Sequence, residues 1–403
     1  MFSFKNKLDP YLYYALQDKL YKDFRVIITC RTLLEKIEKK ILSMKCQVIR
    51  TIPSINSISA ILSPRTIERL LEYPEVKYIG IDKYAFICAV PDKRKKINYK
   101  SMLNKITLNN KTTITGKNIG IGIVDTGVFP HIDLISNKNK IKKFLDLING
   151  YHYPYDDNGH GTFISGIICS SGISSKGQYK GISPGSHLYS IKAFNNLGKG
   201  FISDILFAIN ILINEALENN IKIICLPFET LYYDKFILSL FQCLFNKAID
   251  NGIVVIVPSG NNTNEFNSMT GISILPNCIT VGGLINSNTP YNYSSLGNYT
   301  KTKKPDVSAL CNNICSLKTD TKYIPERNGV KLYPHHMTEH YTYYSGTSCA
   351  AAYVSGICAL LYEYNPNLNY KDILSLLKLS CRQLDIQKSL QGAGIVDISK
   401  IFK

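Results

Sequence analysis

The sequence predicts an α/β protein in which a doubly wound, mostly parallel sheet follows a small α+β domain of the open-sandwich type. In the larger C-terminal part, continuous apolar runs alternate with helix-like segments, which is typical of a parallel sheet covered on both faces. The N-terminal part shows the order strand, helix, two strands, helix, strand. A lysine-rich stretch separates the two patterns. We therefore expect domains at 1–88 and 118–403, joined by a linker at 89–117.

The first domain is predicted as one small sheet with two helices. Its elements are expected as a strand at 24–30, a helix at 31–44, two strands within 46–63, a helix at 65–73 and a strand at 76–82. In the first helix, apolar residues recur three and four positions apart. Ser63 followed by Pro64 predicts the start of the second helix, because serine caps helices and proline fits their first turn.

The linker is indicated by its charge. Residues 89–118 carry eight lysines or arginines and a single acid, Asp92. They contain few large apolar side chains and show no helical or strand period, which is typical of a connection between domains.

The second domain is predicted from its apolar strands. They are expected at 118–127, 187–194, 221–228 and 253–262, with helices at 203–220, capped near Ser203, and at 236–252. In doubly wound sheets, functional groups collect at the carboxyl ends of the strands. Asp125 and Asn261 follow two of these strands and are therefore candidate site residues.

Four short polar stretches contain the candidate catalytic residues: "VDTG" with Asp125, "DDNGHGTFISGI" with His160, "PSGNN" with Asn261, and "SGTSCAAAYVSG" with Ser348. Each has an ordinary structural explanation when taken alone. An aspartate after a strand often forms a turn, and a serine before a helix usually caps it. For any one stretch taken alone, this structural explanation is preferred to a catalytic role.

Together, the four residues form a complete set for acyl transfer. A serine hydroxyl becomes a nucleophile when a histidine takes its proton, and a carboxylate fixes the tautomer of that histidine. The tetrahedral intermediate needs hydrogen-bond donors for its oxyanion, which an asparagine amide and a helix N-terminus supply. This combination predicts a serine hydrolase.

At these positions the chain resembles the subtilisin-like serine proteases, or subtilases. The stretches "IGIVDTGV", "GHGTFISGI" and "SGTSCAAAYVSG" match the family's three catalytic motifs, and "KPDVSAL" and "GAGIVDISKIF" extend the likeness. The resemblance implies a three-layer α/β/α fold and endopeptidase activity on protein or peptide substrates. By position, it makes Asp125 the orienting acid, His160 the general base, Ser348 the nucleophile and Asn261 the oxyanion donor.

The resemblance extends to the first domain. Residues 54–82 are similar to the family's propeptide, which assists folding and then inhibits the enzyme. The following "KYAFICAV" would lie in the active-site cleft, with self-cleavage near Cys88 and Ala89. On this reading, the N-terminal domain is an intramolecular inhibitor. A permanently attached small domain is the alternative.

The chain departs from the family pattern around the cleft. Cys349 replaces the usual methionine after the nucleophile, and sensitivity to oxidants is expected there. Where the family usually reads "SLG", a wall of the cleft consists of Pro227, Phe228 and Glu229. The opposite wall contains Pro258, Ser259 and Gly260. Pro227 lacks the N–H that would help to bind an extended substrate, and Glu229 would either narrow the cleft or attract a basic side chain.

Cofactors are not required for this chemistry. Asp133 matches a family calcium ligand by position, but the family's calcium loop is not evident, so a structural calcium ion stays open. A long polar loop before Ser348 contains His335, His336 and His340 without the partners of a metal site, and we interpret it as a border of the cleft. The twelve cysteines are scattered and are expected to be reduced and mostly buried.

The composition limits the partners. The net charge is +17, from 47 basic and 30 acidic residues, but the lysines are dispersed and no known nucleic-acid-binding module occurs. We therefore expect no nucleic acid and, because no apolar run reaches ~18 residues, no membrane span. The N-terminus lacks the pattern of a signal peptide, which favours a cytoplasmic location, with non-classical release as the alternative.

The leading hypothesis is a serine endopeptidase made as a self-processing zymogen. The altered cleft walls raise one alternative, a catalytically weak subtilase-like protein that binds peptides and regulates a partner. A basic nucleic-acid-binding protein is the second rival.

Overall fold

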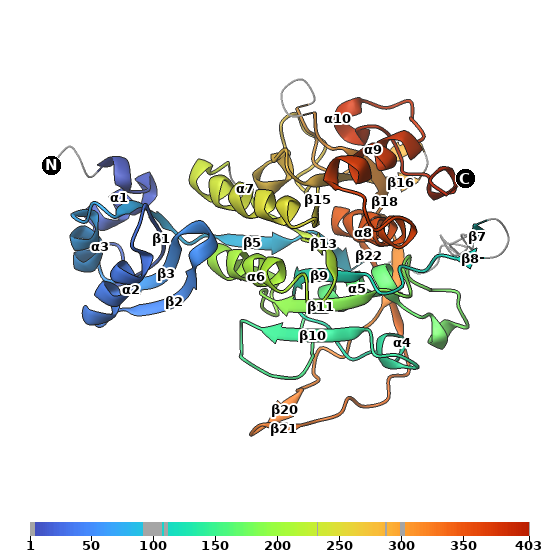
Figure 1. The fold of residues 1–403 in the computed structure, drawn as a ribbon, viewed down its shortest axis with the longest axis horizontal. Coiled ribbons are helices and arrows are strands. Elements are labelled where there is room, and N and C mark those ends of the chain that lie inside the picture. The colour runs from blue at the N-terminus through green and yellow to red at the C-terminus, as the bar shows by residue number, and fades with distance from the viewer. Residues whose placement is uncertain are drawn as a thin grey trace. The chain divides into compact units, whose positions relative to one another are not determined.

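The chain divides into two compact units. A computed structural model describes residues 5–91, 107–108, 112–231, 233–286, 288–298 and 303–402 (Figure 1). The first unit combines Met1–Tyr84 with Phe201–Ile211 and Lys235–Leu244, and the second combines Ala85–Gly200, Leu212–Asp234 and Phe245–Lys403. Most of the expected linker at 89–117 lies outside the described residues, so the linker and the domain boundaries stay predictions.

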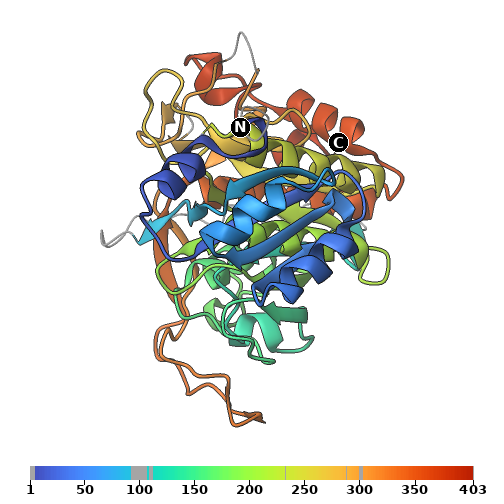
Figure 2. The same ribbon diagram turned by 90° about the vertical axis from the view of Figure 1, so that its left-hand side faces the viewer.

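A four-stranded sheet in the order β2–β3–β1–β4 forms the core of the first unit. Its elements are β1 (Phe24–Cys30), α2 (Leu34–Ser43), β2 (Gln47–Ile52), β3 (Ser57–Leu62), α3 (Pro64–Leu71) and β4 (Val76–Ile81). Neighbouring strands run antiparallel, and Phe24 lies opposite Leu62. The helices α2 and α3 cover one face, where they pack in a single apolar core with the strands (Figure 2). This arrangement confirms the predicted α+β sandwich.

Local capping explains the helix starts in this unit. Ser63 caps α3 as predicted, because its hydroxyl accepts a hydrogen bond from the amide of Thr66 over 3.3 Å. A further helix, α1 (Pro10–Gln17), was not predicted. It is capped by the carboxylate of Asp9 and buries only two of its eight side chains, so its apolar pattern is weak.

Two long helices, α6 (Ile202–Asn214) and α7 (Lys235–Asp250), contribute their N-terminal parts to the first unit. The prediction placed a helix at 203–220, but α6 ends six residues earlier, and turns cover the rest. Asn220 adopts a left-handed φ of 45°, which a helix does not allow.

An ionic network joins the strands of the first unit to α6. Arg25 Nε lies 2.6 Å from Asp82 Oδ2, and Arg25 Nη2 lies 2.6 Å from Asp204 Oδ2. Asp82 also accepts the amide of Ser203 over 3.0 Å. Ser203 was expected to cap this helix. It lies inside the first turn instead, and the carboxylate of Asp82 satisfies its free N–H.

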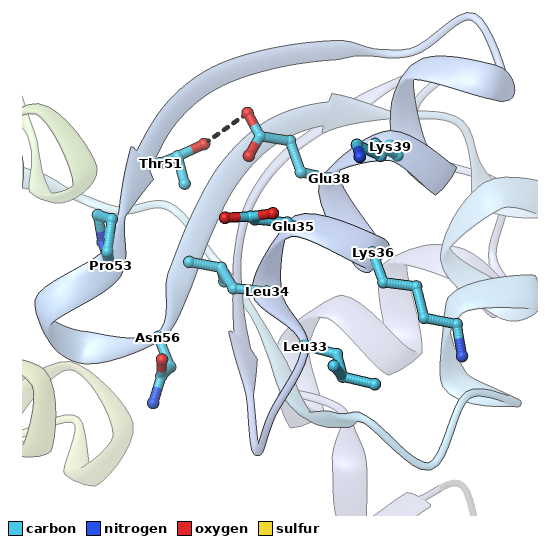
Figure 3. A pocket seen from close by; sticks show the side chains of 9 residues that line it. All are labelled: Leu33, Leu34, Glu35, Lys36, Glu38, Lys39, Thr51, Pro53 and Asn56. Carbon is cyan, nitrogen blue, oxygen red and sulfur yellow. Dashed lines mark hydrogen bonds between the residues drawn. The ribbon is translucent and has the colours of Figure 1, made fainter.

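An open groove lies beside α2 in the first unit (Figure 3). It is lined by Leu33, Leu34, Glu35, Lys36, Glu38, Lys39, Thr51, Pro53 and Asn56. The hydroxyl of Thr51 donates a hydrogen bond to Glu38 over 3.0 Å (Figure 3). Lysines and glutamates alternate along the groove, and its lining offers no histidine, serine or cysteine, so the candidate chemistry lies elsewhere.

An eight-stranded sheet forms the second unit, in the order β10–β11–β9–β13–β15–β16–β17 with β18 beside β16. The strands are β9 (Gly120–Asp125), β10 (Ile141–Asp146), β11 (His187–Lys192), β13 (Ile221–Cys225), β15 (Val254–Pro258), β16 (Ile279–Asn286), β17 (Thr289–Pro290) and β18 (Val307–Leu310). All pairs are parallel except β16 with β17. The predicted doubly wound sheet is confirmed. β10 was not predicted because this edge strand carries exposed Lys142 and Lys143.

Both faces of this sheet are covered. Ile121 and Ile123 of β9 belong to the apolar core that contains α8 (Thr347–Tyr364). Side chains alternate along a strand, so Gly122 points to the other face, where Leu212 of α6 packs so closely that an added Cβ would lie 2.8 Å from it.

The remaining elements of the second unit surround the carboxyl ends of the strands or close the fold. The helices are α4 (Ile132–Ile135), α5 (His160–Cys169), α9 (Tyr370–Ser380) and α10 (Lys388–Gln391), and the short strands are β5 (Tyr84–Ile87), β6 (Val90–Pro91), β7 (Thr107–Leu108), β8 (Thr112–Thr113), β12 (Lys199–Phe201), β14 (Phe228–Glu229), β19 (Ile314–Leu317), β20 (Glu326–Arg327), β21 (Val330–Lys331) and β22 (Tyr341–Ser345). Within the described part of the chain, no helix has the length and apolar character needed to cross a membrane.

Candidate active site

The three predicted catalytic side chains meet at the carboxyl end of β9. Nδ1 of His160 lies 2.7 Å from Oδ1 and 2.9 Å from Oδ2 of Asp125, and Nε2 of His160 lies 3.0 Å from Oγ of Ser348. All three residues are at most 1% exposed. A carboxylate only accepts hydrogen bonds, so Nδ1 carries the proton and Nε2 is free to accept the serine hydroxyl.

Each catalytic side chain is positioned by the end of an element. Asp125 is the last residue of β9, which lies between β11 and β13 in the sheet. The order of the strands reverses at β9, and this switch point is where doubly wound sheets place their functional groups. His160 opens α5 directly after Gly159, which adopts a left-handed φ of 108° that favours glycine. Ser348 lies in the first turn of α8, where backbone N–H groups have no partner inside the helix.

A buried aspartate that the sequence analysis missed connects β9 to α5. Asp156 accepts hydrogen bonds from the hydroxyl of Thr126 over 2.9 Å, the amide of Gly159 over 2.8 Å, and the amide and hydroxyl of Thr162 over 2.8 and 2.7 Å. Because Thr126 follows Asp125 and Gly159 precedes His160, these bonds fix the acid relative to the base. The signal was present, since an aspartate three residues before a glycine is typical of a capping turn.

Lys192 is a second residue that was missed. This lysine is fully buried at the end of β11, opposite Asp125 in the sheet register. Its ammonium group donates to the carbonyl of Thr126 and to the carboxylate of Asp157, both over 2.6 Å, and lies 5.0 Å from the ring centre of Tyr155. It therefore stiffens the loop that follows the catalytic acid.

Burial dominates the electrostatics of the relay. It raises the pKa of Asp125, while attraction and hydrogen bonding to His160 and the amide of Thr126 oppose the rise. Burial thus destabilises the ionised form of Asp125, and the nearby imidazole of His160 stabilises this form by its charge and its hydrogen bond.

Asn261 lies beside the relay and contacts the chain's own residue 88. Its Nδ2 donates to the carbonyl oxygen of Cys88 over 2.7 Å. Its Oδ1 accepts the amide and the hydroxyl of Thr347 over 3.1 and 3.0 Å, so the amide is oriented with its N–H groups toward Cys88. This is the geometry required of an oxyanion donor. Thr347 was not predicted, although it directly precedes Ser348.

The segment Ala85–Pro91 passes through the site as an extended chain within the second unit. Before Cys88, β5 lies between β12 and β14, with Ile87 opposite Phe228. After Ala89, β6 pairs antiparallel with β22. Gly346 lies against the turn between the two strands, where an added Cβ would come within 2.1 Å of the Cys88 carbonyl oxygen. The expected cleavage residues Cys88 and Ala89 thus occupy the cleft beside Ser348.

The first predicted cleft wall contacts this segment. The backbone of Phe228 and Glu229 pairs with β5, while the side chain of Phe228 is buried against Phe194 at a ring-centre distance of 5.1 Å. Pro227 is buried directly before the pairing strand. Glu229 accepts the amide of Asn261 over 2.8 Å. Burial raises the pKa of Glu229, and interactions with the Asn261 amide and the neighbouring Cys88 thiol partly oppose the rise.

The opposite wall of the cleft consists of buried residues. Pro258 ends β15, and Ser259 is buried with its hydroxyl 3.1 Å from that of Ser294. Gly260 adopts a φ of 101°, and an added Cβ there would lie 2.9 Å from Oε2 of Glu229. The two walls therefore touch each other at Gly260 and Glu229.

Cys349 is a buried free cysteine directly after Ser348. It is 1% exposed, and burial raises the pKa of its thiol to about 12. The expected sensitivity to oxidants is therefore wrong for the folded protein, because the reactive species is the thiolate and it needs access to reagent. All twelve cysteines are free and eight are buried, as predicted.

Asp133 is surrounded by hydrogen-bond donors. Its Oδ1 accepts the amide and the hydroxyl of Ser174 over 2.9 and 2.7 Å, and its Oδ2 accepts the hydroxyls of Tyr341 over 2.5 Å and Ser170 over 3.2 Å. Burial alone would raise the pKa of Asp133, but the bonds from Tyr341 and Ser174 outweigh it and lower the pKa. Calcium prefers six to eight oxygen ligands around it. Hydrogen-bond donors occupy the positions around both oxygens of Asp133, so these surroundings do not fit a calcium ion.

The loop histidines do not assemble a metal site. His335 and His336 are exposed, and the ring centres of His336 and His340 are 6.3 Å apart. Among the residues that the structure describes, no group of three or more histidines, cysteines or carboxylates is placed to bind a metal ion. The end of this loop, β22, borders the cleft as expected because it pairs with β6.

The fold and the site together define the class of protein: a doubly wound α/β protein in which a buried aspartate, histidine and serine form one hydrogen-bonded chain, as in serine hydrolases. A model of the subtilase family matches residues 116–394, more than half of the chain. Serine protease AprX of Bacillus subtilis (strain 168) is 31% identical over 358 residues, which cover 85% of this chain and 78% of AprX. Subtilisin DY of Bacillus licheniformis is 26% identical over 286 residues, covering 70% of this chain and 90% of that protein.

A solved structure supports the fold. The crystal structure of fervidolysin from Fervidobacterium pennivorans, a keratinolytic enzyme related to subtilisin, superposes with a TM-score of 0.69 at 18% identity. The match covers 95% of this chain but 61% of fervidolysin, so this chain spans less than two thirds of that protein. From the family model and AprX, the chain belongs to the subtilase family and is a subtilisin-like serine endopeptidase.

Proposed function

We propose that the protein hydrolyses peptide bonds through an acyl-enzyme on Ser348. His160 takes the hydroxyl proton as Oγ attacks the substrate carbonyl, and later returns it to the leaving amine. Asp125 holds the imidazole in its tautomer and stabilises its charged form. Water then attacks the acyl-enzyme by the same relay and frees Ser348. The observation that carries this proposal is the unbroken chain of hydrogen bonds of 2.7 and 3.0 Å from Asp125 through His160 to Ser348.

The oxyanion is stabilised by Asn261. Its Nδ2 already donates to a peptide carbonyl in the cleft over 2.7 Å, so the donor stands ready as that oxygen gains charge. The amides in the first turn of α8 add the favourable dipole of a helix N-terminus. The alternative, a catalytically weak peptide-binding regulator, has no observation in its favour, because the relay and its donor are complete.

We further propose that the protein is made as a zymogen that cuts itself between Cys88 and Ala89. The support is the path of Ala85–Pro91, which pairs with the cleft on both sides of this bond. The N-terminal domain then stays as an inhibitor. The support for this part is that the N-terminal residues Met1–Tyr84 form one compact unit with Phe201–Ile211, a segment of the predicted catalytic domain.

Mass spectrometry and active-site labelling test both parts. Purified wild type is expected to separate into 1–88 and 89–403, and a fluorophosphonate probe is expected to label Ser348 once the N-terminal fragment is removed. Ser348→Ala should stay intact and unlabelled, whereas Ser239→Ala, at an exposed serine of α7, should behave as wild type. An intact wild-type chain that is active overturns the zymogen. A processed wild type that the probe does not label overturns the catalytic assignment.

The chemistry proposed here uses only side chains of the protein, and no cofactor takes part in it. We propose that Asp133 serves as a hydrogen-bonded strut between α4, the loop after α5 and β22, in place of a calcium ligand. The support is its four hydrogen-bond donors.

A further inference from the structure

The carboxylate of Glu229 ends the pocket that receives the side chain of residue 88. Glu229 crosses the cleft from β14 and accepts the backbone amide of Asn261 over 2.8 Å. Burial and the neighbouring carboxylate of Glu229 both raise the pKa of the Cys88 thiol, so the two side chains lie close together. Cys88 is 1% exposed, so the pocket is closed around this short side chain.

The carboxylate of Glu229 reaches the opposite wall of the cleft. Oε2 of Glu229 lies against the backbone of Gly260, where even a methyl group would come within 2.9 Å. A leucine in place of Cys88 would press an apolar group onto a half-buried carboxylate, which is costly because leucine offers it no hydrogen bond. A lysine or arginine would need Glu229 to swing away from the amide of Asn261 and from Gly260. A serine or cysteine needs neither change.

We infer that Glu229 makes this protease select a small, hydrogen-bond-donating side chain, cysteine or serine, on the acyl side of the bond it cuts. The inference rests on the proposed function, because it takes Cys88 as the residue whose carbonyl Ser348 attacks. A glycine at position 229 would remove this carboxylate from the cleft, so the selectivity depends on the side chain of Glu229.

Peptides built on the chain's own cleft segment test the inference. The series is Ala-Phe-Ile-X-Ala-Val, with X as cysteine, serine, alanine, leucine or lysine, and kcat/KM is measured on the processed protein. Wild type should cut the serine peptide about tenfold or more faster than the alanine peptide, since alanine has no polar group to donate to the carboxylate. Leucine and lysine should be poorer still.

Two variants separate size from charge. Glu229→Gly should open the pocket, bring the serine-to-alanine ratio close to one and raise the leucine peptide about tenfold or more. Glu229→Gln keeps the size of the side chain, so leucine should stay poor while the preference for serine over alanine falls. Glu218→Gln removes an exposed carboxylate from the turn before β13 and should keep the wild-type profile.

The full chain gives a second readout. Cys88→Ser should process as wild type and Cys88→Leu should process slowly, and adding Glu229→Gly to Cys88→Leu should restore processing. The inference would be overturned if wild type and both Glu229 variants gave identical peptide profiles. It would also be overturned if wild type preferred lysine and lost this preference in Glu229→Gln. Neither result would overturn the protease function. Failure of the probe to label Ser348, with no peptide cut, would overturn the proposed function and the inference with it.

Discussion

The hydroxyl of Thr347 lies 3.0 Å from Oδ1 of Asn261 and, together with the backbone amide of Thr347, orients the N–H groups of the Asn261 amide toward the cleft. Thr347→Val keeps the shape but removes this donor. We expect kcat to fall about tenfold with little change in KM, because the amide is needed mainly as charge develops on the oxyanion. Steady-state kinetics on a peptide substrate measures both constants.

Asn261→Ala sets the scale for this prediction. Loss of the corresponding donor in subtilisin itself costs about 100- to 1000-fold in kcat, and we expect a similar loss here. Thr347→Ser retains the hydroxyl and should stay close to wild type. If Thr347→Val raises KM and leaves kcat unchanged, the threonine contributes to binding instead of orienting the amide.

Asp156→Ala is expected to destabilise the protein by about 3 kcal/mol or more, because it leaves the buried hydroxyls of Thr126 and Thr162 and the amide of Gly159 without their acceptor. Thermal unfolding measured in the Ser348→Ala background avoids self-digestion. Asp156→Asn retains one acceptor oxygen and should lose less. A melting temperature that does not change in Asp156→Ala would show that these bonds add nothing to the fold.

Cys349 is expected to resist alkylation in the folded protein. Burial raises the pKa of its thiol to about 12, so at pH 8 only about one molecule in 10,000 carries the reactive thiolate. Iodoacetamide at pH 8 should therefore leave activity intact, and peptide mapping should find Cys349 unmodified. Cys243, which is exposed on α7, is the internal control and should react. Rapid modification of Cys349 with loss of activity would contradict its burial.

Chelation of calcium is expected to leave the strut at Asp133 intact. The melting temperature with EDTA should match that with calcium within about 2 °C, since hydrogen bonds occupy both carboxylate oxygens. Tyr341→Phe should lower the melting temperature by several degrees, because a hydrogen bond to a charged group is lost, worth about 1.5–3 kcal/mol. A large fall with EDTA that calcium reverses would restore Asp133 as a metal ligand.

The sequence was most informative where the physics is local. Alternation of buried strands and helices predicted the parallel sheet, and Ser63 with Pro64 predicted a helix start to the residue. The lysine-bearing edge strand β10 and the helix capped by Asp9 were missed, because neither has the apolar pattern of a buried element. The early end of α6 was missed because a left-handed Asn220 does not show in a helix-favouring composition.

The candidate site was predictable at the level of its reacting groups. Asp125, His160, Asn261 and Ser348 stand in motifs whose chemistry is complete only when the four are combined. The supporting residues depend on distances that the sequence does not contain. Lys192 was not predicted as a site residue, yet it is fully buried opposite Asp125 in the sheet register. Glu229 left two readings open, and its bond to the amide of Asn261 favours a narrowed cleft.

The segment Ala85–Pro91 belongs to the same covalent chain as the groups it covers. Dilution therefore cannot relieve the blockage, and the proposed self-cleavage would be a unimolecular event whose rate is independent of protein concentration. Newly made protein would not cleave other protein molecules until that event occurs, at any protein concentration.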